Sequence, residues 1–180
     1  MIKLRRFARR GEVTAAAAAT IQALLHVRPN AAIGLATGRT QEPLFAELIR
    51  LQRAGQISFR HVRFFHLDEY WGLPATSPQS MSGSLQQLFL EATDATLGHF
   101  HRIDGMAADP AQEAARYEAE IRKAGGIDLQ LLGLGTNAHI GFNEPGSPHD
   151  SSTRLIHLTA ETRQQNQDFF PAGAVVPAPT

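Results

Sequence analysis

The sequence contains no cysteine among its 180 residues. Without thiols the chain can form neither a disulfide framework nor a thiolate zinc site, and its redox compartment stays open. There is also no excess of charge of either sign, because Lys plus Arg and Asp plus Glu each number 17. This balance argues against nucleic acid or an anionic membrane as a partner, so any anion must be met by local groups.

Long apolar runs are missing as well. No stretch approaches the roughly 20 apolar residues of a membrane helix. The first ten residues are basic, but the Ala15–Ala19 run behind them is only weakly apolar, so we expect no signal peptide. With 43% hydrophobic residues and no visible internal repeat, the chain predicts a single globular domain over residues 1–180, in the cytoplasm.

Segments typical of strands alternate with segments typical of helices. Amphipathic spacing and stop signals predict helices over Glu12–Val27, from about Pro43 to Gly55, over Leu85–Ala92 and over Pro110–Lys123. Buried strands are predicted at Ala31–Ala36, Val62–Leu67 and Ile127–Leu134, with Leu155–Leu158 as a candidate fourth. This alternation favours parallel pairing through crossover helices, and therefore a three-layer α/β sandwich with a mostly parallel sheet.

Two further stretches have the composition of irregular structure. Leu73–Ser84 is rich in proline, serine and threonine, which predicts a long loop of the kind that often carries function. The tail Pro171–Thr180 is rich in proline and alanine, and we do not expect it to supply a buried element of its own.

Polar breaks follow three of the predicted strands, and in a parallel sheet such breaks meet beyond the carboxyl ends of the strands. The first, Thr37–Thr40, is a glycine turn between a strand and a helix, so its backbone N–H groups and hydroxyls could face an anion. The alternative is an ordinary strand-to-helix turn, since the segment lacks the lysine and the glycine triplet of nucleotide-binding loops.

The second break carries Asp68 and Glu69 side by side. If the two residues continue the strand, their side chains point to opposite faces, and only one of the two carboxylates can enter a given pocket. Flanking aromatic side chains disfavour full solvation of the pair, and partial burial would raise the pKa of a carboxyl group toward neutrality. We therefore favour Asp68 as a general base over a solvated acidic turn.

The third break is a glycine loop that delivers His139 and Glu144 just beyond a strand. An imidazole and a carboxylate presented together suit proton transfer on a small molecule. Metal binding is the rival interpretation, in which these two side chains converge with His66 and Asp68. No ligand pair has the spacing of a zinc helix, so we expect no metal.

The chain resembles the glucosamine-6-phosphate deaminase (isomerase) family in three motifs: Asp-Glu-Tyr-Trp-Gly-Leu-Pro at 68–74, Pro-Gln-Ser at 78–80, and Gly-Leu-Gly-x-x-x-His-Ile-Gly-Phe-Asn-Glu-Pro at 133–145. The resemblance covers essentially the whole chain, in the right order. The related 6-phosphogluconolactonases share the glycine–histidine loop, but they have a basic residue after Asp-Glu and lack Phe-Asn-Glu-Pro. Tyr70 and Phe142–Pro145 therefore indicate the deaminase branch, which implies a Rossmann-like fold and no metal or redox cofactor.

The resemblance implies conversion of glucosamine 6-phosphate and water into fructose 6-phosphate and ammonia. By position, His139 would open the pyranose ring, Glu144 would pair with His139, and Asp68 would move a proton between C2 and C1. The implied catalytic set is Asp68, Asn137, His139 and Glu144, and the implied substrate-binding set is Thr37, Gly38, Arg39, Thr40, Glu69 and Ala138. The implied partner is a small sugar phosphate, and a homo-oligomer is left open.

Three departures from the family pattern bear on the substrate. Asn137 and Ala138 stand where the family usually has aspartate and glycine, and an amide cannot stabilise an imidazolium by charge. Asp168 replaces a phosphate-clamping arginine, so an anion would meet repulsion there unless Arg39 offsets it. The sequence also stops short of the family's last strands and helices, so we expect the C-terminal part of the fold to be lacking.

These departures keep two alternatives open. One is the same scaffold acting on a different sugar or sugar acid, and the other is a catalytically degenerate relative that binds a sugar.

Overall fold

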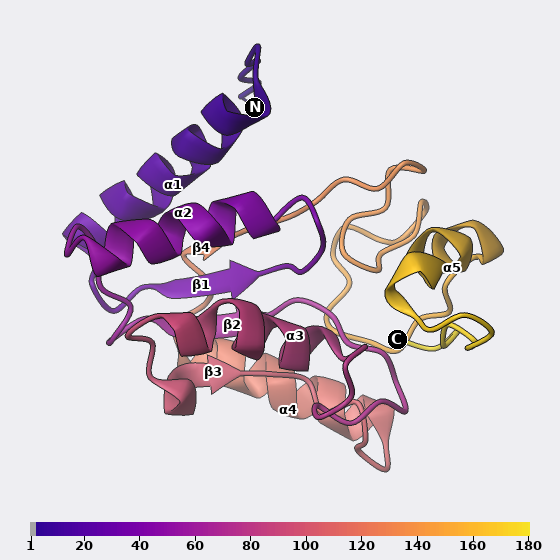
Figure 1. Ribbon diagram of the computed structural model, residues 1–180. Coiled ribbons are helices and arrows are strands. Elements are labelled where there is room, and N and C mark those ends of the chain that lie inside the picture. Colours follow the sequence, from indigo (N-terminus) through magenta and orange to yellow (C-terminus); the bar gives the residue numbers. More distant parts are fainter. Residues whose placement is uncertain (1–2) are drawn as a thin grey trace.

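The computed structural model describes residues 3–180 (Figure 1). Its α-helices are α1 (Arg10–Val27), α2 (Glu42–Arg53), α3 (Met81–Leu88), α4 (Pro110–Lys123) and α5 (Ala160–Asn166). Its strands are β1 (Ala32–Leu35), β2 (Arg63–His66), β3 (Phe100–His101) and β4 (Leu129–Gln130), and its 3-10 helices are η1 (Leu90–Ala92), η2 (Leu97–His99) and η3 (Gln167–Phe169). Within the described residues, no helix is both long enough and apolar enough to cross a membrane.

All four strands belong to one parallel sheet, in the order β3–β2–β1–β4. β1 is buried at every position, as expected for a central strand of a parallel sheet, which is covered on both faces. The pairing of Leu35 with His66 brings the ends of β1 and β2 level. The segments that follow these two strands, Thr37–Thr40 and Asp68–Glu69, therefore leave the sheet at the same edge.

Helices cover both faces of the sheet. On one face, Ile33, Leu35 and Phe64 belong to a core that includes buried residues of α1, α2 and α3. On the other face, Ala32 and Phe65 pack with Tyr117 of α4. Neighbouring strand residues thus serve opposite cores, which is the period-two pattern of a strand. Figure 1 shows α1 and α2 on the opposite side of the sheet from α4, and the predicted three-layer α/β fold is confirmed.

Local signals explain the helix that was predicted with the right bounds, α4. The Asp109 carboxylate accepts hydrogen bonds from the backbone N–H groups of Ala111 (2.8 Å) and Gln112 (3.2 Å), while Pro110 occupies the first helical position. Gly125 and Gly126 follow the helix with φ values of 84° and 92°, a conformation that ends helices and suits glycine.

Several expectations are corrected by the structure. Helix α3 begins at Met81 and not at Leu85, because Ser80 Oγ accepts a hydrogen bond from the Gly83 N–H (3.0 Å) and caps the helix early. The loop predicted over Leu73–Ser84 is correspondingly shorter. Strand β3 was not predicted, since two residues are too few to show a period.

A further correction concerns the C-terminal segment. Leu155–Leu158 is not a strand of the sheet: Ile156 instead exchanges backbone hydrogen bonds with Thr180, at 2.9 and 3.1 Å. This antiparallel contact places Val176 in a small core with Tyr70 and Phe142, where it is 2% exposed. The tail therefore supplies a buried side chain that its composition did not predict.

Strand β4 is an edge of the sheet, paired on one side with β1. It is shorter than the predicted Ile127–Leu134, although the Leu131 N–H still donates to the Gly34 carbonyl (2.9 Å). Leu132 and Leu134, just beyond β4, are 47% and 74% exposed. The segment that follows β4 thus exposes two apolar side chains.

Candidate active site

A hollow of about 790 Å³ lies at the carboxyl edge of the sheet. It is bounded by the β1–α2 loop, the first turn of α3 and the glycine loop that follows β4. Among the residues that line it are Thr37, Gly38, Thr40, Asp68 and His139. The three polar breaks of the sequence therefore meet around one space of a size suited to a sugar.

Asp68 reaches the hollow directly after β2. A Cβ atom built on Gly141 (φ 58°) would come within 3.3 Å of Asp68 Oδ2, so glycine at 141 lets the loop that carries His139 approach this carboxylate. Burial, with a smaller contribution from the charge of Glu69, raises the pKa of Asp68 to about 7. The side chain can therefore take up and release a proton in the neutral range.

Asn137 connects His139 to Glu144. The Asn137 Oδ1 atom lies 2.7 Å from His139 Nδ1, and the Asn137 Nδ2 donates to Glu144 Oε2 at 3.0 Å. Glu144 was expected to pair with His139, but in the structure the contact runs through the amide. Because an amide oxygen only accepts, His139 must carry its proton on Nδ1, which leaves Nε2 free to accept one.

Glu144 is held in place by the start of α5. Its Oε1 accepts hydrogen bonds from the Thr159 N–H (3.0 Å) and hydroxyl (3.1 Å). Burial opposes ionisation, but hydrogen bonds from Thr162, Thr159 and Asn137 outweigh it and lower the pKa of Glu144. The sequence analysis missed these threonines. Thr159 caps α5 by accepting from the Thr162 N–H, so a capping signal at that point could have found them.

The glycine loop seats the imidazole at a cost in backbone strain. A Cβ atom on Gly135 would overlap the His139 ring, at 2.3 to 2.5 Å from three of its atoms, so glycine is required there. Ala138 adopts φ 71°, a left-handed conformation that costs a non-glycine residue about 1 kcal/mol. Its exposed side chain is not among those lining the hollow. Ala138 therefore shapes the turn in front of His139.

The Thr37–Thr40 loop presents its hydroxyls and backbone to the hollow. Gly38 adopts φ 111°, and the Thr37 hydroxyl donates to Met81 Sδ at 2.8 Å. Arg39 is not among the residues that line the hollow: its Nη1 lies 3.5 Å from Asp168 Oδ2, and its guanidinium lies 5.3 Å from the ring centroid of Phe169, which does line it. The carboxylate of Asp168 is thus met by Arg39.

Arg10 of α1 also lines the hollow and supplies a cation there. The sequence analysis did not identify it, because a basic N-terminal run carries no spacing that marks one arginine among several.

Glu69 faces away from the hollow, as expected when its neighbour Asp68 faces into it. Both oxygens of Glu69 accept hydrogen bonds from Tyr70 and from the first turn of α3. This occupation corrects the expectation that Glu69 contacts the substrate.

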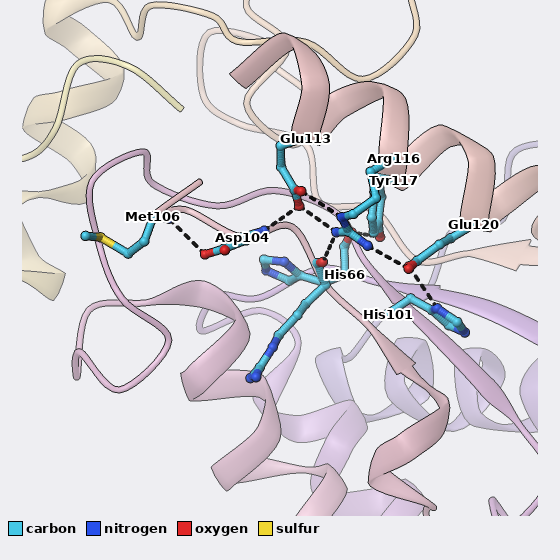
Figure 2. Close-up of polar contacts among 9 residues, drawn as sticks. His66, His101, Asp104, Met106, Glu113, Arg116, Tyr117 and Glu120 are labelled. Atoms are coloured by element: carbon cyan, nitrogen blue, oxygen red, sulfur yellow. Dashed lines mark hydrogen bonds and ion pairs between the residues drawn. The ribbon is translucent and has the colours of Figure 1, made fainter. Parts of the chain in front are cut away.

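A charged network on α4 supports the other side of β2 (Figure 2). Arg116 bonds Glu113 through two nitrogens, at 2.7 and 2.5 Å, and Glu120 at 2.6 Å. Glu120 in turn lies 3.0 Å from His101 Nδ1 on β3. Tyr117 donates its hydroxyl to the backbone carbonyl of His66, the last residue of β2. The network fixes α4 against the strand end from which Asp68 extends.

Within residues 3–180, no three His, Asp or Glu side chains gather as ligands for a metal ion. His66, one of the residues considered for such a site, is buried at 1% exposure with its ring 6.4 Å from that of Phe100. Burial lowers the pKa of His66 to about 4, so its ring is neutral.

Comparisons with known proteins match this chain to one family. Residues 8–168 match glucosamine-6-phosphate isomerases/6-phosphogluconolactonase. A glucosamine-6-phosphate deaminase of Mycolicibacterium smegmatis is 46% identical over 160 residues, which are 89% of this chain and 61% of that protein. A deaminase of Lysinibacillus sphaericus is 44% identical over 150 residues, 83% of this chain and 63% of that protein. The chain spans about three fifths of the length of these relatives.

Solved structures place the fold in the same group. A monomeric glucosamine-6-phosphate deaminase superposes with a TM-score of 0.95 at 35% identity, over 99% of this chain and 74% of that one. A 6-phosphogluconolactonase from Thermotoga maritima superposes with a TM-score of 0.71 at 21% identity, over 90% of this chain and 73% of that one. The second likeness is one of fold alone.

Proposed function

Because the chain belongs to the family of glucosamine-6-phosphate isomerases and 6-phosphogluconolactonases, we propose that it carries the chemistry of the deaminase branch. The substrate is glucosamine 6-phosphate, and the products of its reaction with water are fructose 6-phosphate and ammonia. The observation that carries this proposal is that Asp68 and His139 line one hollow. One of these groups suits ring opening, and the other suits proton transfer between neighbouring carbons.

His139 opens the sugar ring. Its Nε2 is free because Asn137 Oδ1 accepts the proton on Nδ1, so Nε2 can take the proton of the C1 hydroxyl and deliver it to the ring oxygen. The C1–O5 bond breaks as the C1 carbonyl forms. Positive charge that develops on the imidazole is stabilised by Glu144, whose carboxylate lies on the far side of the amide.

Asp68 then moves a proton along the open chain. In its ionised form it removes the proton from C2 while O1 takes a proton from the C2 ammonium, which yields an enolamine. It then returns the first proton to C1, which yields a protonated imine at C2. Water adds to the imine carbon, and the C–N bond breaks to release ammonia and leave the C2 ketone. A carboxyl group that titrates near neutrality suits both halves of this transfer.

The phosphate is bound by the Thr37–Thr40 loop. This loop precedes α2, so its backbone N–H groups and the positive end of the helix dipole face an incoming anion. Arg10 adds a charge within the hollow, and Arg39 adds one behind the Phe169 ring that lines it. The positive charges of these two arginines offset the repulsion between Asp168 and the phosphate.

Ammonia release from glucosamine 6-phosphate tests the proposal. We expect release by the wild type, with fructose 6-phosphate formed in equal amount, and a loss of at least about a hundredfold in Asp68→Asn. Asp150→Asn is the matched control, because Asp150 is an exposed aspartate. Saturable binding of the sugar phosphate without ammonia release would contradict the proposal and favour a sugar-binding relative. Hydrolysis of 6-phosphogluconolactone, together with no ammonia release from glucosamine 6-phosphate, would contradict the proposal in favour of a lactonase.

A further inference from the structure

Glu69 is a buried carboxylate that the reaction above does not use. Its side chain belongs to a residue that is 4% exposed, and both of its oxygens are engaged. Oε1 accepts from the backbone N–H groups of Tyr70 (2.9 Å) and Met81 (3.0 Å). Oε2 accepts from the Ser80 hydroxyl (2.7 Å) and from the N–H (3.0 Å) and hydroxyl (2.8 Å) of Ser82. A carboxylate offers about four lone-pair sites, so this one is fully satisfied as an anion.

These contacts attach the end of β2 to a wall of the hollow. The N–H groups of Met81 and Ser82 are the first two of α3, which have no partner inside the helix, and a negative charge at that end is favourable. Ser80 and Met81 line the hollow, and Met81 accepts a hydrogen bond from Thr37 of the anion-binding loop. Glu69 thus connects the strand that carries Asp68 to the first turn of α3 and, through it, to Thr37.

We propose that Glu69 is a positioning residue, which holds the first turn of α3 against the hollow and keeps a fixed negative charge beside Asp68. The inference rests on the proposed function, since it assigns Asp68 the proton transfer. Glu69 acts on that transfer through Asp68 and the hollow wall, and it does not touch the sugar.

The other charged and titratable groups around Asp68 leave Glu69 as the neighbour whose charge acts on it. Tyr70 follows Glu69 in the sequence, and Tyr117 lies on α4. The hydroxyl groups of both tyrosines are largely buried. Glu113 is neutralised by Arg116. Toward the hollow described above, the charged or titratable groups are His139, Arg10 and Glu42. Asp68 also borders a second hollow of about 250 Å³, where these groups are Glu69, Glu113, Glu118 and Arg154. Burial is the larger cause of the raised pKa of Asp68, and the charge of Glu69 is the second.

Glu69→Gln separates positioning from mere packing. The amide keeps the shape of the side chain but loses the charge, and its NH₂ group faces donors where the carboxylate accepted. We expect the acid limb of the pH profile of kcat/KM to move down by about half a pH unit or more, because Asp68 loses a like charge. We expect kcat to fall about tenfold, because the hollow wall is misplaced.

Two variants serve as comparisons. Glu69→Asp retains the charge but is one methylene shorter, so its acid limb should match the wild type while its kcat is reduced. Glu113→Gln removes another buried carboxylate, 6% exposed, whose charge is paired, so its acid limb should not move. If the acid limb of Glu69→Gln lies at the same pH as that of the wild type, the proposal is overturned. Should Glu69→Gln fail to fold, an unchanged kcat in Glu69→Asp overturns it instead.

A second readout does not depend on turnover. The carboxyl carbon of Asp68 can be titrated by ¹³C NMR, its signal assigned by its loss in Asp68→Asn. We expect the midpoint to fall in Glu69→Gln and to stay in Glu113→Gln. If the wild type releases no ammonia, the proposed function fails while this titration still decides whether Glu69 acts on Asp68. An unmoved midpoint overturns the inference even in an active enzyme.

Discussion

Asp68 is expected to destabilise the folded protein in the neutral pH range, where the proposed mechanism uses its ionised form. Burial, followed by the charge of Glu69, raises its pKa from 3.8 to about 7. The unfolded chain therefore ionises this carboxyl above pH 3.8, whereas the folded chain keeps it protonated up to about 7. The free energy of unfolding must fall as the pH rises through this window. Below pH 3.8 both states are protonated and the cost vanishes.

The size of this effect follows from the shift. About three pKa units at 1.36 kcal/mol each give about 4 kcal/mol as an upper bound. Because the side chain is only half-buried, solvent screening reduces this to about 2 kcal/mol. Asp68→Asn removes the ionisation while keeping the shape. The variant should therefore be more stable than the wild type above pH 7 by about 2 kcal/mol, or about 4 to 8 °C in Tm for a chain of this size.

Thermal and urea unfolding of both proteins at pH 4, 6 and 8 provide the assay. The stability difference should be close to zero at pH 4 and should grow steadily to pH 8. Asp150→Asn, which removes an exposed carboxylate, should show no such growth. A difference that is independent of pH, or an Asp68→Asn variant less stable than the wild type at pH 8, would refute the reasoning. Either result would mean that Asp68 is ionised at little cost in the folded protein.

Three further predictions concern neighbouring features. Asn137→Asp should raise kcat by about tenfold, because a carboxylate next to His139 stabilises an imidazolium by charge; ammonia release at constant pH measures this, and an unchanged kcat would contradict it. His66, whose pKa is lowered from 6.5 to about 4, should cost the wild type up to about 3 kcal/mol of stability as the pH falls from 6.5 to 4, because only the unfolded state takes up the proton. In His66→Asn the corresponding part of the acid-dependent loss in urea unfolding should disappear, and a parallel pH dependence in both proteins would contradict it. Arg39→Ala should weaken binding of phosphorylated sugars about fivefold and of plain sugars not at all, as measured by calorimetry, whereas equal losses for both would show that Arg39 serves only to pair with Asp168.

Features encoded by neighbouring residues were predictable from the sequence. The cap, proline and glycine signals around α4 are local, so its bounds could be read directly. The parallel sheet followed from the alternation of elements, and the family resemblance is confirmed by the match over residues 8–168. Of Asp68 and Glu69, only Asp68 lines the hollow, as predicted, although both residues lie beyond the end of β2 at His66.

Features that depend on distant partners were not predictable in the same way. Glu144 contacts Asn137 and Thr159, and nothing in the spacing of these residues indicates that the amide lies between the carboxylate and His139. The five hydrogen bonds of Glu69 depend on where α3 begins, which the sequence analysis placed too late. Strand β3 has only two residues and exists because β2 pairs with it.

The outer side of β4 bears on how the protein associates with other polypeptide chains. A strand at the edge of a sheet has backbone N–H and C=O groups without partners on its outer side, and these can pair with another strand. A second polypeptide chain that pairs with β4 would satisfy these groups with backbone hydrogen bonds.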